Sequence, residues 1–321
     1  MSRPPALPAA ARRILARDRP TLARVISQVE DGDPAVVPVL RALYGRTGGA
    51  RVVGITGPLG VGKSTLVNAL LGFLRETDRR VGVVAVDPSS PYSGGAVLGD
   101  RIRIDRRADY DRVFFRSMGS RGHAGGVARA TREVVRLLDA FGMNVVLIET
   151  VGSGQVDVEI RTVASTNLVV VVPHLGDEVQ SLKAGLFEIA DVFCVNKSDL
   201  PGADAATRYL RDMVALGARP DGWRPPVVAV SASGSTGLDE LWAAVDAHER
   251  FLDEEGRRLT RDRERLTAEV LGLVRDRFEK EIARTVRSDP VVRRLVDRLV
   301  ARTLDPESAA DALYRIRSRG R

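Results

Sequence analysis

The segment 57–65, "GPLGVGKST", carries residues whose types and spacing suit phosphate binding. Gly57, Gly60 and Gly62 allow the backbone to turn its N–H groups toward a phosphate. Lys63 is placed to reach the β and γ phosphates of a nucleotide, and the helix expected to begin there adds a positive N-terminus. An apolar run precedes the segment and a helical pattern follows it, which is the context that a phosphate loop requires.

Oxygen-bearing side chains near this loop suggest a Mg²⁺ site. The Ser64 hydroxyl is predicted to bind Mg²⁺, and Thr65 belongs to the same nucleotide-binding motif. Glu149 ends a later apolar run, Asp87 ends another, and Asp100 follows in "GGAVLGD". Oxygen ligands shared between protein and phosphates suit Mg²⁺. Each acid also has a simpler explanation as a turn or helix-cap residue, most of all Asp100.

A second motif, "VNKSD", predicts the base. The Asp199 carboxylate can accept hydrogen bonds from guanine N1–H and the exocyclic amino group, whereas adenine N1 is itself an acceptor. Lys197 would lay its stem along the base, with Asn196 beside it in the motif. One strand later, Ser231 and Ala232 begin "SAS", where the Ala232 N–H can be offered to guanine O6. Together with the phosphate loop, this motif predicts binding of GTP and GDP.

Short apolar runs alternate with helical segments and must position these residues. Runs so continuously apolar indicate strands buried on both faces, and therefore a doubly wound α/β core with a mostly parallel sheet. The expected strands are 51–56, 81–86, 112–117, 144–149, 167–172, 191–196 and 226–231.

The sequence predicts three parts: an N-terminal helical extension (1–49), a nucleotide-binding domain (50–252) and a helical C-terminal arm (253–321). Apolar spacing predicts two amphipathic helices within 20–45. Residues 257–318 are expected to be helical and must bury their apolar stripe on their own domain or on a partner chain. The stripe consists of Leu266, Val270, Leu273, Val274, Phe278 and Ile282.

Composition excludes several classes of protein. Of 321 residues 44% are hydrophobic, and the net charge of +7 comes from arginines scattered among 42 acids with few aromatics, so nucleic acid is not an expected partner. Cys194 lies in an apolar run and is expected in the core, which suits a reducing compartment. No segment resembles a membrane span, so a cytoplasmic protein is expected. His248 is expected on the surface of a helix, and His174 is not expected to bind a transition metal.

The motifs, in this order, resemble the MeaB/ArgK-type GTPases, which are chaperones of cobalamin-dependent acyl-CoA mutases. The similarity covers nearly the whole chain, and "DPSSPYSGGAVLGDRIR" is its most specific part. The segments that carry it are "TLARVISQVE", "GITGPLGVGKST", "VAVDPSSPYSGGAVLGDRIRI", "FFRSMGSRGHAGG", "IETVGSGQVDVE", "GDEVQSLKAG" and "VNKSD".

The resemblance implies a homodimer held in part by the C-terminal helices. It implies a GTPase that gates delivery of adenosylcobalamin to the mutase, with an adenosyltransferase as an indirect partner, and that protects or reactivates the mutase. The alternatives are a metallocentre-insertion GTPase, a protein kinase of a transport system, and a module that binds GTP without turnover.

The resemblance also assigns residues near the γ-phosphate. Gly152 would lie at the γ-phosphate and Glu149 near Mg²⁺. Self-sufficient GTPases place glutamine directly after this glycine, but here that position is Ser153 and Gln155 follows two residues later. We therefore expect slow unaided hydrolysis that a mutase accelerates. Lys183, one of only four lysines among 49 basic residues, is the candidate cation; a solvated lysine is the simpler explanation.

Overall fold

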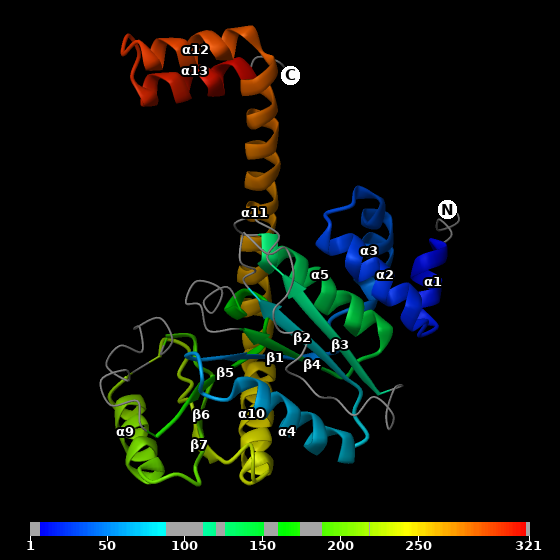
Figure 1. Cartoon of the computed structure of the whole chain (residues 1–321), viewed down its shortest axis with the longest axis vertical. Coiled ribbons are helices and arrows are strands. Elements are labelled where there is room, and N and C mark those ends of the chain that lie inside the picture. The colour runs from blue at the N-terminus through cyan, green and yellow to red at the C-terminus, as the bar shows by residue number, and fades with distance from the viewer. Residues whose placement is uncertain are drawn as a thin grey trace. The chain divides into compact units, whose positions relative to one another are not determined.

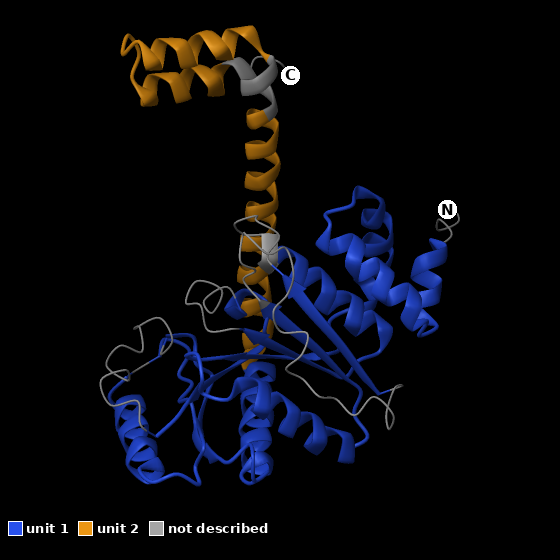
Figure 2. Cartoon of the chain, viewed as in Figure 1, with its two compact units in different colours: residues 1–254 blue, residues 255–321 orange. Residues whose placement is uncertain are grey.

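The computed structural model describes residues 7–87, 112–119, 126–150, 160–173, 188–217 and 219–318. The chain divides into two compact units, residues 1–254 and residues 255–321, which Figure 2 shows in different colours. The larger unit contains the sheet and the smaller one is helical. The expected separation of the N-terminal helices as a part of their own stays a prediction.

The larger unit is built on one parallel sheet (Figure 1). Its order is β3-β2-β4-β1-β5-β6-β7, and each pair of neighbouring strands is parallel. All the expected strands are present, so the prediction of a doubly wound α/β fold is confirmed. The strands are β1 (Arg51–Thr56), β2 (Val81–Asp87), β3 (Val113–Gly119), β4 (Val145–Thr150), β5 (Thr166–Val171), β6 (Val192–Asn196) and β7 (Val227–Val230).

Helices cover both faces of this sheet. One buried cluster joins the sheet to the N-terminal helices, α5 and α9, and the other joins it to α4 and α10. The central strand β1 has β4 on one side and β5 on the other, so the loop after β1 opens in the middle of the carboxyl edge, where open α/β sheets bind ligands. The helices of this unit are α1 (Ala9–Leu15), α2 (Arg19–Glu30), η1 (Pro34–Val36), α3 (Val37–Leu43), η2 (Tyr44–Arg46), α4 (Lys63–Glu76), α5 (Gly126–Phe141), η4 (Ile160–Thr162), α9 (Ala203–Leu216), α10 (Leu238–Asp253) and, at the boundary, η5 (Glu254–Gly256).

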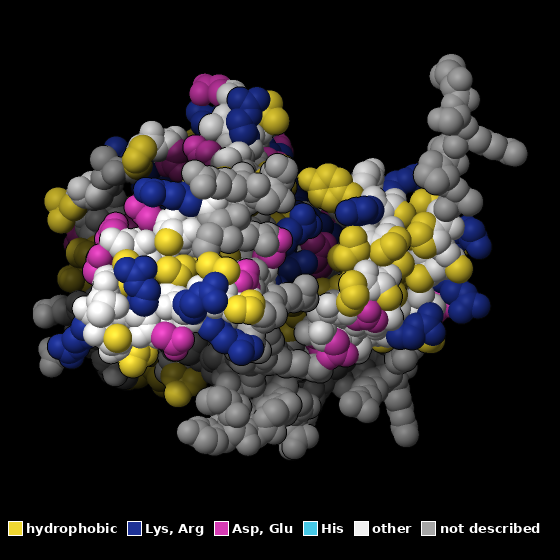
Figure 3. Space-filling view, turned by 90° about the horizontal axis from the view of Figure 1, so that it is seen from above, with side chains coloured by type: hydrophobic (Ala, Val, Ile, Leu, Met, Phe, Trp, Pro, Cys, Tyr) yellow, Lys and Arg dark blue, Asp and Glu magenta, His cyan; other side chains and the backbone are white. Residues whose placement is uncertain are grey.

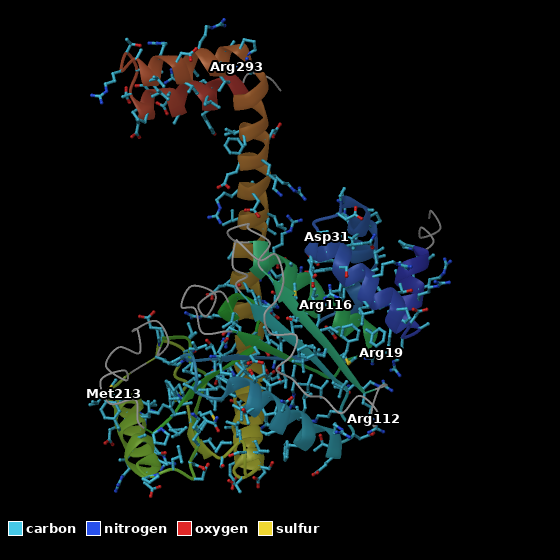
Figure 4. The ribbon with its side chains drawn as sticks, in the orientation of Figure 1. Arg19, Asp31, Arg112, Arg116, Met213 and Arg293 are labelled. Atoms are coloured by element: carbon cyan, nitrogen blue, oxygen red, sulfur yellow. The ribbon has the colours of Figure 1, made fainter. Side chains whose placement is uncertain are left out.

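Arginines tie the N-terminal helices to the edge strand β3. Arg116 donates to both oxygens of Glu30 on α2 at 2.7 Å, a two-point contact that suits the planar guanidinium. Arg19 donates to the Val113 carbonyl at 2.8 Å, and its guanidinium lies over the Phe114 ring. Figure 4 labels both arginines in the region where α2 approaches β3. From above, in Figure 3, hydrophobic side chains gather over these N-terminal helices at the right of the view.

The smaller unit consists of α11 (Arg257–Ser288), α12 (Pro290–Val300) and α13 (Pro306–Ser318). The expected helical arm is therefore confirmed. On α11, large apolar side chains remain uncovered: 58% of Val270, 58% of Val274 and 39% of Phe278 are exposed. No helix in the described part of the chain is long and apolar enough to cross a membrane.

Two single-residue expectations have opposite outcomes. Cys194 is fully buried in β6, as expected, and burial raises the pKa of its thiol. The prediction that His248 lies on the surface is wrong, because none of its surface is exposed. Its helix α10 packs on the sheet through a wide stripe, and the polar partners that bury this imidazole come from segments far away in the sequence.

Candidate nucleotide-binding site

The phosphate loop connects β1 to α4 at the centre of the sheet. Gly57 has φ +143°, and a Cβ there would lie 2.2 Å from the Val170 carbonyl oxygen of β5. Gly62 has φ +88°, and a Cβ there would lie 2.6 Å from the Asn196 side-chain nitrogen. Any larger residue at either position would force the loop away from the neighbouring strands.

Lys63 begins α4 and folds back over this loop. Its Nζ donates to the Gly57 carbonyl at 2.6 Å and to the Pro58 carbonyl at 2.8 Å, and the side chain is almost completely buried. The ammonium therefore lies against the loop that is predicted to surround the β and γ phosphates. Thr65, in the first turn of α4, is exposed.

Ser64 and Glu149 meet beside the loop. The Ser64 hydroxyl donates to Glu149 Oε1 at 2.5 Å, although 85 residues separate them. Glu149 is 3% exposed, and its second oxygen, Oε2, has no hydrogen-bond partner among the residues that the structure describes. Burial raises the pKa of the Glu149 carboxyl, while the Ser64 hydrogen bond and the Lys63 charge lower it by less.

This arrangement fits a Mg²⁺ ion. A buried carboxylate oxygen without a partner carries a free-energy cost that a cation would remove. The hydroxyl and carboxylate are both hard oxygen ligands. Among the described residues, no group of three or more His, Cys, Asp or Glu side chains could hold a metal ion by itself. The ion would therefore need further oxygens, which the phosphates of a nucleotide supply.

Asn196 connects the predicted guanine-binding motif to the phosphate loop. Its side-chain amide donates to the Val61 carbonyl of the phosphate loop at 2.9 Å and accepts from the Ala232 N–H at 3.1 Å. Lys197, at φ +56°, donates to the Gly60 carbonyl at 3.2 Å. The base motif is therefore attached directly to the phosphate loop.

Asp199 is positioned by Ser231. The Ser231 hydroxyl donates to Asp199 Oδ1 at 2.5 Å, and this hydrogen bond is the main cause of the lowered pKa of the carboxyl. Ser231 was expected only as a neighbour of the base, so this contact was missed. In the structure the Ala232 N–H is donated to Asn196, and its contact with guanine O6 stays a prediction.

The family comparison agrees with this geometry. The family described as "Methylmalonyl Co-A mutase-associated GTPase MeaB" matches residues 22–287. The chain belongs to the MeaB family. It is a GTPase, as the sequence predicted, and the resemblance to MeaB/ArgK proteins is confirmed.

Relatives of this MeaB-family GTPase match over most of their length. A Pyrococcus abyssi protein that has GTPase in its name is 43% identical over 307 residues, covering 93% of each chain. The Escherichia coli GTPase ArgK is 35% identical over 254 residues, covering 77% of each. A crystal structure described as a LAO/AO transport system kinase is 26% identical, with a TM-score of 0.72 and 99% of each chain covered.

Several predicted site residues of the MeaB-family GTPase lie outside the described residues: Asp100, Gly152, Gln155 and Lys183. Asp87 ends β2, in which Ala85 is opposite Glu149 of β4, so its backbone lies at the same carboxyl edge of the sheet as Glu149. The other predicted residues come together at this edge.

A contact that the sequence did not predict joins Thr56 to Thr150 at 3.3 Å, at the carboxyl ends of β1 and β4. The signal was a threonine at the end of each of two neighbouring strands.

Proposed function

We propose that this GTPase is the chaperone of a cobalamin-dependent acyl-CoA mutase, and that it gates adenosylcobalamin loading and protects or reactivates the mutase. The match to the mutase-associated family over residues 22–287 supports this proposal. The test is to mix the protein with methylmalonyl-, isobutyryl- and ethylmalonyl-CoA mutase and to measure complex formation and GTPase rate. One of them should bind and accelerate hydrolysis; no binding and no acceleration with any of them would contradict the proposal.

We infer that GTP is bound with Mg²⁺. Ser64, Glu149, Asp87 and Asp100 would hold the ion together with the phosphates. Mg²⁺ supplies neutralisation of charge on the phosphate oxygens. Lys63 would bind the β and γ phosphates, and Asp199 would select guanine. The unpaired Glu149 Oε2 supports this assignment.

We propose further that the partner mutase stimulates hydrolysis through Lys183, with Gln155 and Gly152 at the γ-phosphate. Lys183→Ala should keep GTP affinity and lose mutase-stimulated hydrolysis. Lys183→Arg separates charge from shape, because arginine keeps the cation but is larger and planar. Stimulation that is unchanged in both variants would make Lys183 an ordinary solvated lysine.

We propose that the smaller unit makes a homodimer. The uncovered apolar side chains of α11 support this, since an apolar stripe of this kind usually packs on another surface. Val274→Glu with Phe278→Glu should give a monomer in light scattering, and Arg277→Glu, an exposed charge on the same helix, is the matched control. A dimer that survives the double substitution would place the interface elsewhere.

The transport-system kinase is the second candidate, because the solved relative with a TM-score of 0.72 is described by that name. A kinase would transfer the γ-phosphate of radiolabelled nucleotide to a protein hydroxyl. Release of all label as inorganic phosphate, in the presence of a candidate transport component, would exclude this function.

A further inference from the structure

The strand β1 contacts the residues that flank the segment 151–159. This segment contains Gly152 and Gln155, begins directly after Thr150 and ends directly before Ile160. The same strand leads into the phosphate loop. Contacts of β1 with Thr150 and Ile160 therefore decide where the segment leaves the sheet, and where it returns, relative to the phosphates.

The returning end packs on Gly54, in the middle of β1. Ile160 begins the turn η4 and is buried. A Cβ at Gly54 would lie 2.8 Å from Cδ1 and Cγ1 of Ile160 and 3.0 Å from the Ala164 Cβ. Carbon atoms in contact usually lie about 3.5 to 4.0 Å apart, so only glycine leaves room for Ile160 here. Gly54 lies within a regular strand, so the requirement comes from space rather than from backbone conformation.

Hydrogen bonds also attach the returning end to its surroundings. Arg132 of α5 donates from Nη1 to the Thr162 hydroxyl of η4 at 3.0 Å. Ser165, which leads into β5, donates to the Val52 carbonyl of β1 from its main-chain N–H at 2.8 Å and from its hydroxyl at 3.0 Å. The turn is therefore attached to α5 on one side and to β1 on the other.

The leaving end contacts Thr56, the last residue of β1. Thr150 Oγ1 lies 3.3 Å from Thr56 Oγ1, and both side chains are buried. This distance exceeds the usual O–H···O distance of about 2.8 Å, so the contact is weaker than an ordinary hydrogen bond. The register of β1 and β4 pairs Ile55 with Glu149, so the two threonines lie one residue beyond this pair.

Gly54 and Thr56 lie on the same face of β1, because alternate residues of a strand share a face. The residues between and before them, Val53 and Ile55, belong to the buried cluster that includes α4. The predicted phosphate-binding side chains come from the start of α4, and so from the opposite face of the sheet. The contacts of β1 with Thr150 and Ile160 are therefore separate from the contacts expected to bind the phosphates.

We propose that Gly54 and Thr56 are positioning residues for GTP hydrolysis, which fix both ends of the segment 151–159 relative to the phosphate loop. This inference rests on the proposed place of Gly152 and Gln155 at the γ-phosphate. Hydrolysis requires a water molecule positioned at the γ-phosphate, and a small displacement of the groups around it lowers the rate strongly. Binding of GDP uses the phosphate loop and the base motif, and is not expected to depend on these two contacts.

Single-turnover GTP hydrolysis by the full-length protein, measured beside GDP affinity, tests the returning end. Gly54→Ala should slow hydrolysis by about tenfold to a hundredfold and change GDP affinity by less than about threefold. Gly82→Ala is the matched control, because a Cβ there would also be crowded, 3.0 Å from Leu138 Cδ1, but near the start of β2. It should leave the hydrolysis rate unchanged. If Gly54→Ala does not fold, Ile160→Ala removes the same contact without adding an atom and should slow hydrolysis likewise.

A pair of threonine variants tests the leaving end. Thr56→Val and Thr150→Val each remove a hydroxyl with little change of shape, and each should slow hydrolysis by about twofold to fivefold, in line with one weak contact. The double variant should be slowed by less than the product of the two single effects, because this coupling isolates their shared contact. Thr56→Ser keeps the hydroxyl and should retain the rate. Thr207→Val, which removes a buried hydroxyl that donates to the Ala203 carbonyl of α9 at 2.8 Å, is the control.

The outcomes distinguish this inference from the proposed function. Slower hydrolysis in Gly152→Ala and Gln155→Ala, with unchanged hydrolysis in Gly54→Ala and in both threonine variants, would overturn the inference alone. Unchanged hydrolysis in Gly152→Ala and Gln155→Ala would contradict the proposed place of these residues, and the inference with it. A loss of GDP affinity as large as the loss of rate in Gly54→Ala would also overturn the inference, because β1 would then act through the phosphate loop.

Discussion

The two ends of the nucleotide site differ in how completely their polar groups are satisfied. At the guanine end, Asn196 bonds to the phosphate loop and to Ala232, and Ser231 bonds to Asp199. At the phosphate end, Glu149 is buried, and within the described part of the chain one of its oxygens has no hydrogen-bond partner. The pKa of Glu149 is raised by burial, and the pKa of Asp199 is lowered mainly by its hydrogen bond from Ser231.

This difference indicates separate roles in binding. The guanine end is held in place by its own hydrogen bonds, so little rearrangement is needed when the base binds. The phosphate end contains a buried carboxylate oxygen that has no hydrogen-bond partner among the described residues, and a cation would satisfy it. We therefore expect selectivity for the base to depend on geometry, and affinity for the phosphates to depend on electrostatics.

The largest effect is expected from Lys63→Ala at the phosphate end. Removing the buried ammonium leaves the phosphate charge without its nearest protein cation, and kcat/KM for GTP should fall by about a thousandfold. Lys280→Ala, which removes an exposed lysine of α11, is the control and should leave GTP turnover unchanged. Measurement of GTP turnover at saturating Mg²⁺ distinguishes the two. A loss smaller than tenfold would mean that Lys63 does not bind the phosphates.

A smaller effect, but one of specificity, is expected from Asp199→Asn at the guanine end. The amide would present its NH₂ toward guanine N1–H, so GTP affinity should fall by about a hundredfold. Xanthine has a carbonyl in place of the exocyclic amino group, so xanthosine triphosphate should bind better to the variant than to the unmodified protein. Equal loss for both nucleotides would show that Asp199 supports the loop rather than reading the base.

Binding at the two ends of the site should depend on pH in different ways. Glu149 must be ionised to bind Mg²⁺, and its pKa is raised above its ordinary value of 4.5, so Mg²⁺ affinity should weaken as the pH falls toward that raised pKa. The pKa of Asp199 is lowered, so preference for GDP over ADP should persist to lower pH. Titration of Mg²⁺ and of the two nucleotides between pH 5 and 8 tests both statements. Glu149→Gln should raise the Mg²⁺ concentration required by about tenfold and abolish its pH dependence.

The strands and the nucleotide-binding motifs could be predicted because each is a local pattern in the sequence. Buried parallel strands are continuous apolar runs, so β1 and β4 to β6 were recognisable, and Lys63 and Asp199 lie in motifs with fixed spacing. Contacts across large sequence separations were not accessible in this way. The burial of His248 depends on Thr166 and Asp191, which follow no periodic pattern with it. The Ser231 contact with Asp199 likewise depends on how far two neighbouring loops extend.

The smallest effect is expected from Ser231→Ala. The Ser231 hydroxyl orients an exposed carboxylate and accepts from the Gly234 N–H at 3.3 Å, so its loss loosens Asp199 without removing the group that reads the base. Affinity for GDP should fall by only about threefold to tenfold, in line with one hydrogen bond. Ser233→Ala is the matched control, because the Ser233 hydroxyl lies 3.4 Å from that of Ser231 and its described contacts do not include Asp199. If Ser231→Ala reduced GDP affinity as strongly as Asp199→Asn, the structure of the guanine end would depend on this one serine. The guanine end would then be less firmly held by its own hydrogen bonds than its contacts indicate, and it would differ less from the phosphate end.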